Sequence, residues 1–337
     1  MLNFDEARFL RIQSGAVALA RPIDEAVGRL LKAGKENIFF LGTGGAAILM
    51  QPAAQFLERC STFPTFCDLS AELMLCGSRH LGPKSIVVIP SRSGTTKESV
   101  EALAYCKSRG ATIISLTAHD RTPVADGADY AFVNFAEDDT SSESFYLQAL
   151  LIALSVMRHR NEYDAYDTVV KELSLLPALL VEVKRAFEPR THRLAETIKD
   201  SPFHIISGAG STWPEAFYYG MCILEEMQWI RTRPVHASDF FHGTLELVEK
   251  GVSVIIFKGE DSCRPLVERM ETFAAAYTDK LSILDTKEMK LPGLSERVRA
   301  LVSPILLATV LERVSAHLEV LRNHPLTTRR YYKKVAY

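Results

Sequence analysis

Short apolar runs rich in β-branched residues alternate along this chain with longer stretches in which apolar residues recur at helical spacing. Runs of the first kind predict buried strands, and stretches of the second kind predict helices that pack against them. Strands that alternate with helices predict a parallel sheet with helices on both faces. In the first half of the chain, four runs are predicted to be strands: 37–41, 65–67, 86–90 and 112–116.

Turn and cap residues mark the helices around these strands. Residues 1–35 predict one or two helices that end at Gly34, and residues 143–158 predict the helix that closes this half. Three further helices are predicted: one through Leu57, one capped by Ser70 and ending near Cys76, and one ending at Gly110.

The same pattern then starts again. A strand that leads through Gly-x-Gly into a helix begins both halves, with the first glycine at Gly42 and at Gly208, which indicates an internal duplication. The elements predicted in the second half are strands at 203–207, 252–257 and 281–285 and helices at 214–229, 262–278 and 303–322. We therefore predict two tandem, doubly wound αβα units with parallel sheets. Their predicted boundaries are a helical segment 1–35, a first unit 36–160, a helical connector 161–197, a second unit 198–322 and a tail 323–337.

Length and composition narrow the class of protein. At 337 residues the chain exceeds one typical domain, and its formal net charge of −2 predicts no nucleic-acid or anionic-membrane surface. The uncharged stretch 38–57 could span a bilayer by length, but its glycines and its strand–turn–helix pattern predict a soluble segment. The first residues are unlike a signal peptide. The six cysteines lack metal-site spacing, and we interpret them as reduced, buried thiols of a cytoplasmic protein.

The turn Ser91-Arg92-Ser93-Gly94-Thr95-Thr96 carries the main chemical signal. It follows an apolar strand and leads into a helix, so backbone N–H groups and four hydroxyls gather at the positive end of a helix dipole. Helix capping alone would require fewer hydroxyl groups. We interpret this turn as a binding site for the phosphate of a small molecule.

The first glycine turn allows a second interpretation. Gly42, Gly44 and Ala47 fit a dinucleotide fingerprint, and Asp68 ends the next strand at about the expected distance, as in an oxidoreductase. That interpretation leaves both the Ser/Thr turn and the second strand–glycine–helix entry unexplained. We therefore expect no redox cofactor.

Glu226 and His242 are the candidate proton-transfer pair. They lie sixteen positions apart, near Glu225, His236, Asp239 and Glu246, in a region rich in aromatic residues. Each could instead be a structural residue. Beside a phosphate site, however, a histidine and a carboxylate could open a sugar ring and move a carbon-bound proton. No metal-ligand spacing is present, so no metal is expected.

The motifs together resemble the sugar isomerase (SIS) domain family, to which the isomerase half of glucosamine-6-phosphate synthase belongs. The resemblance is carried by the doubled unit and by the turns at 42–46 and 91–96. Three further segments are similar to deglycases of 6-phosphorylated Amadori compounds, of the fructoselysine 6-phosphate and fructose-asparagine 6-phosphate types: EMQW at 226–229, FFHG at 240–243 and the tail from His324.

The resemblance implies roles for individual residues. Glu226 would be the catalytic carboxylate, and His242 would be a ring-opening histidine that reaches the site from the partner subunit of a homodimer. The tail would fold over the active site. The residues implied to bind substrate or its phosphate are Gly44, Gly45, Ser91, Arg92, Ser93, Thr95, Thr96, Asp239 and Arg330. Two positions depart from the family pattern: Ala46 stands where serine is common, and Asp239 where glutamate is usual.

The predicted activity is that of a cytoplasmic, cofactor-free deglycase. It would hydrolyse a 6-phosphorylated fructosyl or glucosyl amino acid to glucose 6-phosphate and the free amino acid. Two alternatives stay open at this point: an isomerase or deaminase for an amino-sugar phosphate, and a non-catalytic protein that senses a phosphosugar. The sequence contains no predicted helix-turn-helix ahead of the paired units, which argues against a transcriptional regulator.

Overall fold

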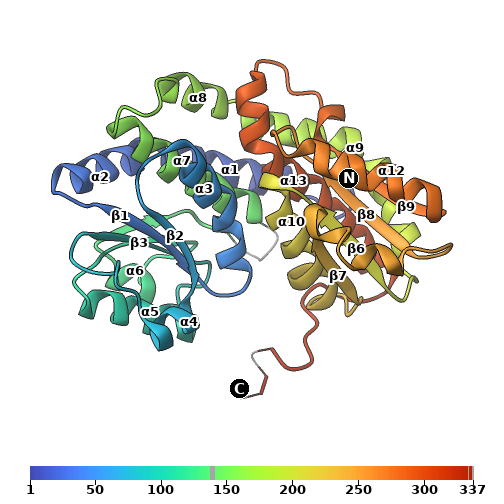
Figure 1. Ribbon diagram of the computed structural model, residues 1–337, viewed down its shortest axis with the longest axis horizontal. Coiled ribbons are helices and arrows are strands. Elements are labelled where there is room, and N and C mark those ends of the chain that lie inside the picture. Colours follow the sequence, from blue (N-terminus) through green and yellow to red (C-terminus); the bar gives the residue numbers. More distant parts are fainter. Residues whose placement is uncertain (137–140, 333, 336–337) are drawn as a thin grey trace. The chain divides into compact units, whose positions relative to one another are not determined.

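The computed structural model describes residues 1–136, 141–332 and 334–335, and it divides into two compact units (Figure 1). The first unit comprises Glu6–Pro177, and the second comprises Met1–Asp5 together with Ala178–Tyr337. Each unit contains one wholly parallel sheet, as predicted. The finer boundaries drawn from the sequence, including a separate connector, stay a prediction.

The sheet of the first unit has five strands in the order β2-β1-β3-β4-β5. The four strands predicted in this half are present with slightly longer bounds, and β5 is an addition that the sequence analysis missed. The strands are β1 (Asn37–Gly42), β2 (Thr65–Leu69), β3 (Ser85–Ser91), β4 (Thr112–Thr117) and β5 (Tyr130–Val133).

Helices cover both faces of this sheet (Figure 1). The N-terminal segment forms two helices, within the range predicted. Ser70 is the first residue of its helix rather than a cap: Leu69 holds the cap position, and the Ser70 side chain is buried. The helices are α1 (Glu6–Ala18), α2 (Ala20–Lys32), α3 (Gly45–Cys60), α4 (Ser70–Cys76), α5 (Lys97–Ser108), α6 (Pro123–Gly127), α7 (Ser142–His159) and α8 (Tyr166–Leu173).

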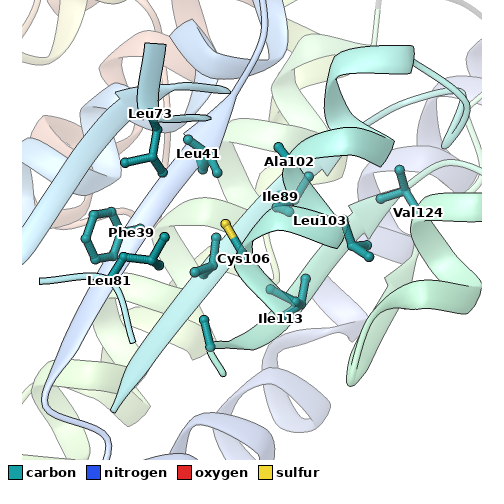
Figure 2. Close-up of a cluster of buried hydrophobic side chains, with 12 residues drawn as sticks. Phe39, Leu41, Leu73, Leu81, Ile89, Ala102, Leu103, Cys106, Ile113 and Val124 are labelled. Atoms are coloured by element: carbon teal, nitrogen blue, oxygen red, sulfur yellow. The ribbon is translucent and has the colours of Figure 1, made fainter. Parts of the chain in front are cut away.

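The alternation of side chains along the strands builds the core of the first unit. Residues at odd positions, such as Phe39, Ile89 and Ile113, point to the face that α4, α5 and α6 cover (Figure 2). Leu73 and Leu103 close this cluster from the helices. Each fully buried side chain of this kind contributes about 1.5–3 kcal/mol, so the cluster stabilises the packing of these helices on the sheet.

The sheet of the second unit repeats this topology with one strand fewer, in the order β7-β6-β8-β9. β7, an edge strand that contains Pro234, was not predicted from the sequence. The strands are β6 (His204–Gly208), β7 (Thr232–His236), β8 (Ser253–Lys258) and β9 (Lys280–Asp285).

The helix predicted at 214–229 is different in the structure. An α-helix of six residues, α10, continues as a π-helix, η2, and regular helix ends at Glu225. The helices of the second unit are α9 (Leu176–Ile198), η1 (Gly210–Thr212), α10 (Trp213–Tyr218), η2 (Tyr219–Glu225), α11 (Ala237–Phe240), η3 (Thr244–Leu247), α12 (Arg264–Tyr277), η4 (Thr286–Glu288) and α13 (Glu296–Leu321).

The long helix α13 begins seven residues before the predicted start at 303, because Ser295 caps it and Pro304 lies inside it. Among the described helices, α13 alone is long and apolar enough to cross a membrane by length and composition. Of its most apolar window, 89% is buried inside the fold, as in the core helix of a globular unit. The stretch 38–57 is not one helix but β1 followed by α3.

A buried arginine on α13 ties the first residues of the chain to the second unit. Arg313 is fully buried, and its Nε donates to Glu188 Oε2 at 2.8 Å. The Leu2 N–H donates to Glu188 Oε1 at 2.9 Å, and the Leu2 carbonyl accepts from Arg313. Burial opposes ionisation of Glu188, but Arg313 and Leu2 outweigh it and lower the pKa of Glu188 to about 2.

The cysteines are all free, as expected, but they are not all buried. Cys106 and Cys222 lie in cores, and burial raises the pKa of Cys106 to about 12. Cys60, Cys67 and Cys76 are exposed, so the interpretation of these three as buried thiols is wrong. Cys60 and Cys76 are the last residues of α3 and α4, and Cys67 lies in the edge strand β2, so an apolar run in the sequence does not ensure burial at these positions.

Candidate active site

The strand order of the first unit places a switch point between β1 and β3. Chain connections leave these neighbouring strands in opposite directions, and ligands of open α/β sheets bind beyond the carboxyl ends of strands at such a point. The glycine turn follows β1 and the Ser/Thr turn follows β3, so the topology brings both sequence motifs to this one edge.

The Ser/Thr turn at 91–96 is held in a tight conformation. Gly94 has φ +65°, and its N–H donates to the Ser91 carbonyl at 3.0 Å. A Cβ at Gly94 would lie 2.0 Å from Thr122 Oγ1, so no other residue fits there without displacement. The Arg92 carbonyl accepts the Ala118 N–H at 3.0 Å, which ties the turn to the end of β4.

The hydroxyl groups of this turn are largely uncommitted within the described residues. Ser91 is 3% exposed, and its Oγ has no hydrogen-bond partner there. Ser93 and Thr95 bond each other, Oγ1 to Oγ, at 3.1 Å. Thr96 is the N-cap of α5, yet its side chain makes no capping hydrogen bond. The first turn of α5 therefore keeps donors available for an anion.

The glycine turn is open in the same way. Gly44 is the N-cap of α3 with φ 56°, and Gly45 is the first residue of the helix. Thr43, which the sequence analysis did not select, has a buried Oγ1 without a partner among the described residues. A threonine between two glycines ahead of a helix was the signal that could have identified it. Ala46 adds no hydroxyl group.

The second unit has an equivalent switch point between β6 and β8, but a carboxylate fills it. Asp261 Oδ2 accepts the Ser211 N–H at 2.7 Å and the Ser211 Oγ hydroxyl at 2.6 Å. Asp261 Oδ1 accepts the Cys263 N–H at 2.8 Å. A Cβ at Gly210, whose φ is +57°, would lie 2.5 Å from this carboxylate. The chain thus supplies its own anion at this turn.

Glu226 lies in a turn directly after the π-helix η2. Its N–H donates to the Met221 carbonyl at 3.1 Å, which continues the wide π-type spacing by one residue. Three residues later, Trp229 has φ +55°, a strained value for a bulky side chain. π-Helical turns and strained residues gather at functional sites in proteins, because such geometry persists only where its surroundings impose it.

An open pocket of about 1040 Å³ within the second unit includes Glu226. Five basic residues and three acidic residues line it together with aromatic side chains, so the pocket is mixed in charge with an excess of cations. The lining residues are Lys199, Asp200, Ser201, Pro202, Phe203, Glu225, Glu226, Trp229, Ile230, Arg231, Thr232, Arg322, Arg329, Arg330, Tyr331 and Tyr332.

The C-terminal tail contacts Glu226 directly. Arg329 Nε lies 2.9 Å from Glu226 Oε1, with 12% of the arginine side chain and 31% of the glutamate side chain exposed. Arg330, the tail residue selected from the sequence, lies with its guanidinium carbon 3.9 Å from the centre of the Trp229 ring. The residue that pairs with Glu226 is therefore the neighbour of the one selected.

His242 and Asp239 lie elsewhere in the second unit. Asp239 is in the short helix α11, and its carbonyl accepts the His242 N–H at 2.9 Å. Both residues are exposed, and neither is among those that line the Glu226 pocket. A single chain thus does not bring His242 into that pocket. Among the described residues, no group of histidine, cysteine and acidic side chains could hold a metal ion.

These features define an α/β protein of two doubly wound units, one of which has an open, hydroxyl-rich turn at its switch point. The model of the SIS domain family matches residues 31–158. Fructosamine deglycase FrlB of Bacillus subtilis (strain 168) is 30% identical over 304 residues, which cover 90% of this chain and 93% of the relative. The chain belongs to the SIS domain family.

Two further comparisons agree over the length of the chain. Fructoselysine 6-phosphate deglycase of Escherichia coli (strain K12) is 24% identical over 306 residues. The matched region covers 91% of this chain and 88% of the relative. The crystal structure of a candidate phosphosugar isomerase of Bacillus subtilis has a TM-score of 0.88 at 28% identity. It covers 96% of this chain and 99% of its own. The chain is thus similar to deglycases and phosphosugar isomerases along nearly its whole length.

Proposed function

We propose that this protein is a deglycase that hydrolyses a 6-phosphorylated fructosyl or glucosyl amino acid to glucose 6-phosphate and the free amino acid. The observation that carries the proposal is a full-length likeness to a fructosamine deglycase in a chain whose pocket contains Glu226. The uncommitted hydroxyl groups at 91–96 support a phosphorylated substrate.

The chemistry needs a base and a water molecule, and it balances without a redox cofactor. In the open-chain ketosamine, Glu226 removes a proton from C1 while the C2 oxygen gains one, which gives an enaminol. A proton returned to C2, together with loss of the N–H proton, gives an imine between C1 and the amino-acid nitrogen. Water adds to that imine, the C1–N bond breaks, and the sugar leaves as an aldehyde, so one water molecule is consumed.

The remaining roles follow the family resemblance. The turn at 91–96, with Gly44 and Gly45, holds the phosphate, and His242 assists opening of the cyclic sugar. Because His242 is exposed and does not line the Glu226 pocket of its own chain, we propose that a second copy of the chain supplies it. The protein would then act as a cytoplasmic homodimer. Arg330 and Asp239 would complete the contacts to substrate.

A coupled assay for glucose 6-phosphate tests the activity. Purified protein is offered 6-phosphofructosyl adducts of lysine, asparagine, aspartate and glutamine. We expect release from at least one adduct, and loss of release in Glu226→Gln and His242→Ala, because each variant lacks a proton-transfer group. Glu225→Gln, a change of the neighbouring carboxylate that bonds Thr232 at 2.6 Å, is the matched control and should stay active.

Other outcomes select the alternatives. Release of ammonia from glucosamine 6-phosphate, with no turnover of any adduct, would favour an amino-sugar-phosphate isomerase or deaminase. Binding of glucose 6-phosphate with no turnover of either class would favour a phosphosugar sensor. An active Glu226→Gln variant would remove Glu226 from the mechanism.

A further inference from the structure

We propose that Arg329 is a positioning residue that holds the Glu226 carboxylate in its working orientation. The inference rests on the function proposed above, in which Glu226 is the base. The ion pair joins Arg329 Nε to Glu226 Oε1 at 2.9 Å, within the range of a charge-assisted hydrogen bond. Arg329 is 12% exposed, so solvent screens this pair less than it screens a surface pair.

The tail fixes Arg329 in place through contacts on its own side of the pocket. The Leu326 N–H donates to Glu319 Oε1 at 3.0 Å, and Gln228 Nε2 donates to the His324 carbonyl at 2.8 Å. Arg329 Nη1 also donates to the Leu326 carbonyl at 2.7 Å. The guanidinium is therefore bonded on two edges, to the tail backbone and to Glu226.

Glu226 needs such support because its backbone lies just beyond the regular helix. A glutamate side chain has several rotatable bonds, and a turn restrains them less than a packed helix face does. A base acts efficiently only when its oxygen lies within hydrogen-bond reach of the proton that it removes. A guanidinium also makes a carboxylate a weaker base. We expect the rate gained from correct positioning of Glu226 to exceed the rate lost through lower basicity.

The neighbouring arginine provides a contrast. Arg330 stacks on Trp229 at 3.9 Å, and this contact is of the cation–π type. Arg329 instead bonds a carboxylate through a donor nitrogen. Arg330 thus contacts an aromatic ring and Arg329 contacts the catalytic carboxylate. Of the two, only loss of Arg329 should affect the chemical step.

The test separates kcat from KM. We expect Arg329→Ala to lower kcat about 100-fold with little change in KM, because misplacing a catalytic group by about 1 Å costs that much. Arg329→Lys should restore part of kcat, and added guanidinium ion should raise the activity of Arg329→Ala but not of the wild type. Arg233→Ala, a change of an exposed arginine on β7 outside the pocket, is the control.

A second measurement does not depend on turnover. Hydrogen exchange at 324–330 should become faster in Glu226→Gln, which loses the charged partner of Arg329, and should stay unchanged in Glu225→Gln. Unchanged exchange in Glu226→Gln, or a wild-type kcat in Arg329→Ala, would overturn the inference while leaving the proposed function intact. A wild-type protein that turns over no adduct would instead overturn the proposed function, whatever the exchange shows.

Discussion

The two switch points of this molecule have the same topology, but a carboxylate of the chain occupies the turn only at the second one, as far as the described residues show. In the first unit, Ser91 and Thr43 hold buried hydroxyl groups without partners among the described residues, and the N-cap side chain of α5 makes no capping bond. In the second unit, Asp261 accepts three hydrogen bonds from the equivalent turn region. Each unit therefore has a turn of this kind at its switch point, and in the second unit a carboxylate of the chain itself occupies it.

This contrast shows why fold alone does not locate a site. The same strand–glycine–helix entry occurs twice, yet in the second unit Asp261 already accepts hydrogen bonds from the Ser211 N–H and hydroxyl groups, which a ligand would otherwise need. At this turn, the donors stabilise the fold instead. Asp261 is the side chain that accepts hydrogen bonds from the turn of the second unit, so its substitution tests the comparison there, and substitution of Ser91 tests it in the first unit.

The largest expected effect comes from removing the Asp261 carboxylate from the turn of the second unit. Asp261→Ala leaves the N–H groups of Ser211 and Cys263 without their acceptor and should lower the free energy of unfolding by about 2 kcal/mol. Inorganic phosphate should raise the melting temperature of this variant more than that of the wild type, because phosphate can replace the lost carboxylate.

Turnover is the control for that experiment. The KM for the substrate should be unchanged in Asp261→Ala, since the proposed phosphate site lies in the other unit. A KM raised in proportion to the loss of stability, or an equal response of both proteins to phosphate, would contradict the comparison. Asp261→Asn, which keeps one accepting oxygen, replaces the other with an NH2 group and removes the charge, should have a stability between those of the wild type and Asp261→Ala.

Removal of a hydroxyl group from the turn of the first unit should weaken phosphate binding without lowering the free energy of unfolding. Ser91→Ala deletes a buried hydroxyl that has no partner among the residues the structure describes, so the free energy of unfolding should stay equal or rise. Affinity for glucose 6-phosphate, measured by calorimetry, should fall about tenfold, which corresponds to about 1.4 kcal/mol. Ser115→Ala removes a buried hydroxyl in the middle of β4 that likewise has no partner in the described part of the chain, and it should leave affinity unchanged. Equal affinities of Ser91→Ala and wild type would place the phosphate elsewhere.

The smallest expected effect lies at the opposite edge of the sheets. His204 pairs with Ser253 in the second unit where Asn37 pairs with Ser85 in the first. Burial lowers the pKa of His204 to about 4, so the folded state favours the neutral ring. The unfolded state, with a pKa near 6.5, binds the proton first, so stability is complete above about pH 6.5 and falls as pH drops toward 4.

At pH 6 this linkage should cost the wild type about 1 kcal/mol relative to pH 7.5, or about 2–4 °C in melting temperature. His204→Asn introduces the residue of the first unit and should remove that part of the pH dependence. Melting curves of both proteins at the two pH values decide the matter. Parallel curves would show that His204 is not the titrating group.

The sequence predicted most of the fold because its signals are local. Apolar runs such as 86–90 are long and clearly bounded, and β3 formed where they indicated. β7 was missed because Pro234 and flanking polar residues hide a strand that only an edge position tolerates. The sequence prediction placed the start of α13 at 303, although Ser295 caps the helix and Pro304 lies inside it.

The candidate site was predictable in its motifs but not in its contacts. The turn at 91–96 and Glu226 follow from residue type and resemblance. The Asp261 carboxylate and the Arg329 ion pair join residues 50 and 103 positions from their partners along the chain, and no local pattern encodes such pairs. The π-helix before Glu226 was also out of reach, because its residues have the same apolar spacing as an α-helix.

The contacts that join Arg313, Glu188 and Leu2 have a consequence for synthesis of the protein. The first unit is one continuous stretch of chain, so it can fold while the ribosome is still translating the second. The second unit needs Leu2 and Arg313 together, and these residues are 311 positions apart. The first residues can therefore form this contact only after α13 has been synthesised. A bulky fusion at Met1 would interfere at this last step, whereas the first unit would form as usual.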